Sequence, residues 1–195
     1  MVEENKECLK IVKDFYRDVL TVFPEYKDKL QEYEIEFLME GKHGEKLYEY
    51  CLETYPQHFF NILYQNAEIF SENESLNFLP SINFVEVWKD EEVSEKSRET
   101  IWKYLQLILF SVSKNVNSQE SFGDTAKLFE AIDTDEFKNK LEETISNMDS
   151  CFDTSGNNFS DISFNNTEDL PDPEKLHEHL NKMLDGKLGN LAREI

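Results

Sequence analysis

The chain has 195 residues, and its 41 acidic against 20 basic side chains leave a net charge of −21 at pH 7. This balance argues against direct binding to DNA or RNA, because phosphate backbones are held by clusters of Lys and Arg, and most basic residues here have an acidic neighbour. Hydrophobic residues make up 39% of the chain, with 15 Phe among them, which is enough for a core and excludes wholesale disorder.

Cysteine usage and the distribution of apolar residues predict an intracellular protein without membrane attachment. The three cysteines, Cys8, Cys51 and Cys151, form no CxxC pair and indicate reduced thiols. The opening residues, MVEENKECLK, are charged and predict no signal peptide. The longest strongly apolar stretch, from Tyr104 to Val112, is too short to span a membrane.

The first elements of the chain have helical spacing. One stripe repeats every three or four residues and comprises Leu9, Val12, Phe15, Val19 and Val22/Phe23. Pro24 ends this helix and opens a short second one through Leu30. The period of residues 32–40 also fits a strand, but their acidic residues favour a helix. Gly41 and Gly44 mark a turn.

The middle of the chain is dense in apolar residues and predicts the core. We expect a helix over residues 47–55 and a second, buried on most sides, over residues 57–70. Residues 71–83 predict a polar loop that contains Pro80. Residues 84–88 predict a single turn of helix.

The longest predicted helix covers residues 94–115, with Ser94 as its N-cap. It is apolar nearly all round, so we expect the other helices to wrap it. A short helix over residues 123–132 follows. Asp133 and Glu136 then match a capping box, with Asp in place of Ser or Thr, and begin another helix.

These elements predict an all-α fold, a single multi-helix globular domain over residues 1–149 around a central apolar helix. Residues 150–171 are rich in Ser, Asn and Asp and predict a linker without a core of its own. Phe152, Phe159 and Phe164 stand at wide intervals in it. The sequence leaves two alternatives for these rings: they dock on the domain itself or on a partner.

Residues 172–195 predict a C-terminal amphipathic helix with Asp172 as N-cap and Pro173 in its first turn. Its apolar stripe comprises Leu176, Leu180, Leu184, Leu188, Leu191 and Ile195. Gly186 and Gly189 lie beside the stripe. Either another surface approaches them closely, or Asp185-Gly186 ends the helix. The candidate partner-contact residues are Leu184, Leu188, Leu191, Ile195, Phe159 and Phe164.

Motifs that carry chemistry are missing from the sequence. No Walker loop, GxGxxG, GxSxG or HExxH is present, and residues 153–163 lack the order of an EF-hand loop. His177 and His179 are two residues apart, so on a helix they point to different faces. We therefore expect no catalytic residue, no cofactor and no metal, and a protein that is not an enzyme.

Three stretches together carry a resemblance to a known group of proteins. They are YPQHFFNILYQN (residues 55–66), ETIWKYLQLILF (99–110) and LDGKLGNLAREI (184–195). As a set they resemble an uncharacterised protein family encoded by large DNA viruses of algae and amoebae. The resemblance implies a viral protein whose relatives continue beyond the equivalent of Ile195, and it implies no activity and no functional residue.

Two functions are consistent with these features. The first is a non-enzymatic viral protein that acts as a helical protein–protein interaction or assembly module, with a viral or host partner or with a second copy of itself. The alternative is an acidic regulator that binds basic proteins, either histone-like or nucleic-acid-binding. Both place the protein inside the cell, in the host cytoplasm, a viral factory or the virion.

Overall fold

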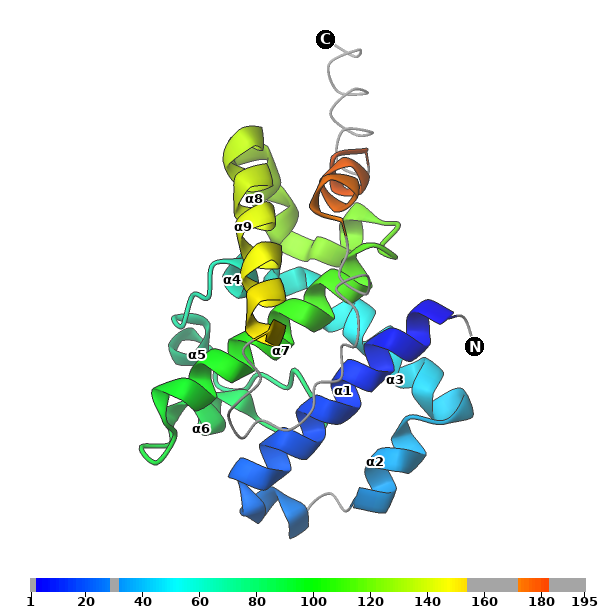
Figure 1. Cartoon of the computed structure of the whole chain (residues 1–195), viewed down its shortest axis with the longest axis vertical. Coiled ribbons are helices and arrows are strands. Elements are labelled where there is room, and N and C mark those ends of the chain that lie inside the picture. Colours follow the sequence, from blue (N-terminus) through cyan, green and yellow to red (C-terminus); the bar gives the residue numbers. More distant parts are fainter. Residues whose placement is uncertain (1–2, 29–31, 154–171, 183–195) are drawn as a thin grey trace.

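A computed structural model describes residues 3–28, 32–153 and 172–182 of the chain. Within these residues the fold is all-α, as predicted, and no strand is present. The elements in chain order are α1 (Glu3–Val22), η1 (Pro24–Asp28), α2 (Glu32–Leu38), α3 (Gly41–Thr54), η2 (Pro56–His58), α4 (Phe59–Leu63), α5 (Ile69–Glu72), α6 (Phe84–Lys89), α7 (Glu95–Ser113), η3 (Gln119–Thr125), α8 (Ala126–Ala131) and α9 (Thr134–Asp153). A further helix covers residues 173–182 (Figure 1).

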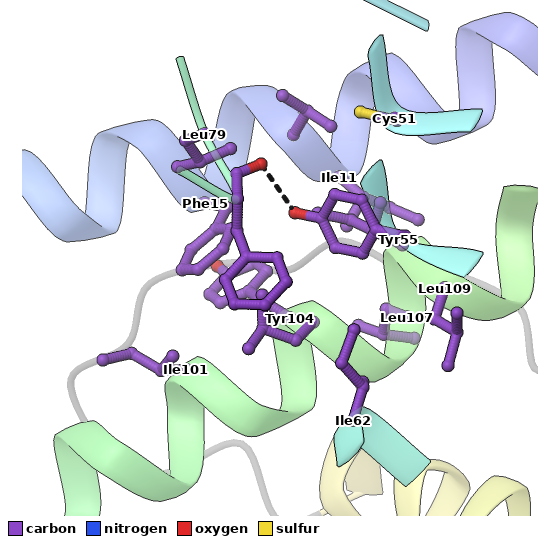
Figure 2. Packing of buried hydrophobic residues seen from close by; sticks show 14 of the residues in the cluster. Ile11, Phe15, Cys51, Tyr55, Ile62, Leu79, Ile101, Tyr104, Leu107 and Leu109 are labelled. Atoms are coloured by element: carbon purple, nitrogen blue, oxygen red, sulfur yellow. Dashed lines mark hydrogen bonds between the residues drawn. The ribbon is translucent and has the colours of Figure 1, made fainter. Parts of the chain in front are cut away.

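Helix α7 is the centre of the molecule, and the other long helices pack around it (Figure 1). Its N-cap is Ser94, whose hydroxyl accepts a hydrogen bond of 3.1 Å from the Ser97 amide. Every residue from Tyr104 to Ser113 is buried, which confirms the predicted central helix. Helix α1 lies along it, and the rings of Phe15 and Tyr104 stack there with centroids 4.7 Å apart (Figure 2).

The predicted start of α9 is confirmed at its cap. The Asp133 carboxylate accepts hydrogen bonds from the amides of Asp135 and Glu136, at 2.9 and 3.1 Å. The helix then runs through Asp153, beyond the boundary at 149 predicted for the domain. Residues 154–171, the remainder of the predicted linker, lie outside the described residues.

The single helix predicted over residues 57–70 is wrong. Helix α4 ends at Leu63, and the chain turns at Gln65, which has a left-handed φ of 52°. The buried side chain of Gln106 on α7 donates to the carbonyls of Ile62 and Leu63, both at 3.2 Å, and so satisfies acceptors at the end of α4. Most apolar residues of this segment are buried as expected, but in two short helices, and Tyr64 is exposed.

The polar loop predicted over residues 71–83 is also wrong in part, because its apolar side chains are buried. Leu76, Phe78, Leu79 and Ile82 belong to the core. Tyrosine hydroxyls anchor the backbone of this segment: Tyr16 donates to Pro80 O at 2.9 Å, Tyr55 to Phe78 O at 3.0 Å (the dashed line in Figure 2), and Tyr50 to Asn77 O. The segment is therefore a strap over α1 and α3 that buries its apolar side chains and exposes most of its polar ones.

The turn predicted at Gly41 and Gly44 lies slightly earlier in the chain. Residues 39–40 form the turn, and Gly41, with a φ of 52°, is the first residue of α3. Gly44 is buried inside that helix. A Cβ on Gly44 would lie 2.6 Å from the carbonyl oxygen of Met39, so the close approach of the preceding turn requires glycine here.

Candidate functional site

The predicted partner-contact residues lie outside the part of the chain that the structure describes. This holds for all six of them: Leu184, Leu188, Leu191, Ile195, Phe159 and Phe164. The start of the same apolar stripe is described, however, and it shows how the C-terminal helix joins the domain.

The helix over residues 173–182 is docked on the domain. Asp172 caps it, accepting a hydrogen bond of 3.0 Å from the Glu174 amide. Leu176 and Leu180 are 2% and 0% exposed and belong to the main core. These first two positions of the apolar stripe therefore serve the fold of this chain.

Polar and aromatic contacts fix the same helix between α9 and the end of α7 (Figure 1). His179 Nε2 donates to the carbonyl of Val116 at 2.8 Å, and the buried His177 ring lies 5.5 Å from the Phe137 ring, centroid to centroid. The two imidazoles point to separate partners, as their spacing predicts, and the His177 side chain is buried. We call this docking area the C-terminal seat.

An aromatic cluster surrounds α4 and α9 near the C-terminal seat. The ring of Phe59 lies 5.1 Å from Phe129 and 5.9 Å from Phe137, and Phe60 lies 4.5 Å from Phe129. Edge-to-face and tilted pairs of this kind add to the free energy gained by burial. The cluster gives the seat a rigid support.

A hollow of about 280 Å³ lies between η1 and α6, and we call it the acidic hollow. It is lined by Phe23, Glu25, Tyr26, Glu86, Val87 and Asp90. Burial raises the pKa of the Tyr26 phenol, and the nearby Glu86 and Glu25 carboxylates raise it further. Three carboxylates around an apolar floor can receive a cationic side chain with an aliphatic stem.

A second hollow of about 200 Å³ lies between the end of α4, α7 and α9, and we call it the lysine pocket. Its lining comprises Leu63, Tyr64, Gln65, Lys103, Gln106, Lys140, Thr144, Asn147 and Met148. No carboxylate is among these residues, so the two hollows carry opposite charge. A sequence signal for this pocket exists in retrospect, since Lys103 interrupts the apolar run of the central helix.

The described thiols and imidazoles are arranged as structural groups. Cys8 and Cys51 are 0% exposed. Hydrogen-bonding contact with the Cys8 thiol, together with burial, raises the pKa of Cys51 well above its ordinary value, so that Cys51 stays a poorly nucleophilic thiol. Burial lowers the pKa of His58, whose ring packs 5.5 Å from Phe78.

Within residues 3–28, 32–153 and 172–182, no group of three or more His, Cys, Asp or Glu side chains is placed to hold a metal ion. In the same ranges no helix is both long and apolar enough to cross a membrane. No protein-family model, curated protein or solved structure matches the chain, so the comparisons assign it neither family nor activity.

Proposed function

We propose that this chain is a non-enzymatic helical module that binds or assembles proteins through its C-terminal helix. The observation that supports this most is the burial of Leu176 and Leu180 in the C-terminal seat. The domain holds the start of the helix, while the sequence continues the same stripe at Leu184 and Leu188. An apolar stripe on a helix anchored at one end is suited to helix-in-groove or helix–helix packing.

The surface of the domain itself gives less support for a docking site. Among the side chains that the structure describes, the exposed large apolar ones are Val22, Phe37, Tyr64 and Leu128. They lie on different elements, and single exposed apolar residues are normal on soluble proteins. The proposed interaction therefore belongs to the C-terminal helix.

The cellular setting is part of the proposal and rests on the sequence resemblance. We place the chain among the proteins of large DNA viruses, in the host cytoplasm, a viral factory or the virion. Its partner is then a viral or host protein or a second copy of the chain.

Truncation after residue 182 tests the proposal, because it keeps the C-terminal seat and removes the outer stripe. Sedimentation should show a larger mass for the full chain than for the chain 1–182 if the partner is a second copy. Leu188→Glu should act like the truncation, while Lys187→Glu, one residue away and off the stripe, should not. Equal masses, together with capture of the same proteins by both chains from infected cells, would contradict the proposal.

A second candidate function, an acidic regulator of basic proteins, is favoured by the acidic hollow. A Lys or Arg side chain could lay its stem over Phe23 and Val87 and direct its charge to Glu86 and Asp90. Fluorescence anisotropy with a lysine-rich peptide tests this. Affinity should fall steeply with salt and should drop for Asp90→Asn but not for Glu91→Gln. An affinity that is insensitive to salt or to Asp90→Asn would rule this function out.

A further inference from the structure

The lysine pocket has the charge opposite to that of the chain. Acidic side chains outnumber basic ones 41 to 20 in the sequence, yet the charged residues that line this pocket are Lys103 and Lys140. Because both lysines line one hollow, a negative charge that binds there would be attracted to both.

Lys103 carries the stronger part of this argument. It stands on the central helix between Trp102 and Tyr104 and is only partly exposed. Its side-chain ammonium forms no hydrogen bond or ion pair with another residue within the described ranges. Among the described residues, then, the charge of this half-buried lysine has no carboxylate partner, although the chain has twice as many acids as bases.

Lys140 is held in place on the opposite wall. Its Nζ lies 5.4 Å from the centre of the Tyr64 ring and 3.3 Å from a carboxylate oxygen of Glu143. The Glu143 side chain is 61% exposed and does not line the pocket. The ammonium is therefore oriented by its neighbours while it remains at the edge of the hollow.

The neutral walls of the pocket are polar and firmly built. The Gln106 amide is committed to the carbonyls of Ile62 and Leu63, and the Thr144 hydroxyl donates to the carbonyl of Lys140 at 2.7 Å. Gln65 lines the pocket from a left-handed backbone position. These bonds restrain the Gln106 and Thr144 side chains at the wall of the hollow.

We propose that the lysine pocket binds a compact dianion of the phosphate or phosphate-monoester class. Two ammonium groups match its charge, and charge-assisted hydrogen bonds from lysine are a standard means of holding phosphate. The volume of about 200 Å³ is below the roughly 300–1,000 Å³ of pockets for drug-sized ligands, which favours a small anion. At physiological salt, acids farther than ~8 Å away are largely screened.

Titration with inorganic phosphate at constant ionic strength, followed by amide chemical shifts, tests the proposal. Saturable shifts should centre on Gln65 and Asn147. Lys103→Gln and Lys140→Gln should each weaken binding about tenfold, the effect of losing one charge-assisted bond. Lys103→Arg should retain binding, as should the matched control Lys96→Gln, which lies on the same helix outside the pocket.

A parallel titration with glycerol 3-phosphate identifies the source of the anion. Tighter binding than inorganic phosphate supports a phosphate monoester, and equal binding supports the free ion. Shifts that do not saturate, that spread over all surface lysines, or that survive Lys103→Gln unchanged would overturn the proposal. Thermal melting of each variant without phosphate shows that the substitutions leave the fold intact.

Discussion

Replacing Leu180 by alanine tests whether the C-terminal helix is part of the folded domain. Leu180 is fully buried and belongs to the main core. The substitution removes about three apolar carbon groups, worth ~0.8 kcal/mol each on burial, or ~2.4 kcal/mol in total. A cavity that does not collapse adds to this, so we expect a loss of about 2–4 kcal/mol in the free energy of unfolding.

Urea denaturation followed by circular dichroism measures the loss. Leu128→Ala is the matched control, because the Leu128 side chain is also on a helix but is 53% exposed. We expect this substitution to change the free energy of unfolding by no more than about 0.5 kcal/mol. Equal effects of the two substitutions would refute the docking of residues 173–182. If amide exchange in Leu180→Ala becomes rapid in that helix alone, the helix undocks locally, and this undocking limits the measured loss in free energy of unfolding.

Three further substitutions probe the rest of the fold by denaturation. Gly44→Ala should destabilise the protein by about 1–3 kcal/mol, because its Cβ would meet the Met39 carbonyl oxygen at 2.6 Å; an unchanged midpoint would contradict this. Tyr55→Phe should cost about 1–3 kcal/mol by leaving the buried Phe78 carbonyl unpaired; a neutral result would mean that water replaces the hydroxyl. Burial raises the pKa of Asp14, so its contribution to stability is present below about pH 3.8 and lost as the pH rises through the folded pKa. Asp14→Asn should therefore raise Tm at pH 7 and lose this advantage below pH 3.8. A gain in Tm that does not change with pH would refute burial of the Asp14 charge as its cause.

Features encoded within one helix turn were predictable from the sequence. Ser94, Asp133 and Asp172 accept hydrogen bonds from amides two or three residues later, as capping requires. The burial of α7 was predictable for a similar reason. From Tyr104 onward the helix is apolar nearly all round, so the sequence predicts burial there without a choice of face.

Features that depend on distant residues were not predictable. Helix α4 ends where Gln106, more than forty positions later, donates to its last carbonyls. The strap around Phe78 is held against the domain because the Tyr16 and Tyr55 hydroxyls donate hydrogen bonds to its carbonyls. Likewise Lys103 and Lys140 meet only when α7 and α9 pack against the same turn. The apolar pattern marks residues for burial, but it does not state which polar partner will satisfy the backbone beside them.

The net charge of a chain and the charge of one pocket decide different kinds of binding. Duplex DNA presents a negative charge about every 1.7 Å along its axis, so a protein needs a long row of cations to hold it, and interleaved acids oppose this. A compact dianion responds mainly to groups within one Debye length, ~8 Å at physiological salt. On that scale the cations are Lys103 and Lys140, and the exposed Glu143 carboxylate, 3.3 Å from Lys140, is the acid that competes for them. Weak binding of nucleic acid and the proposed binding of phosphate are therefore compatible in one chain, and both are measurable on the same sample.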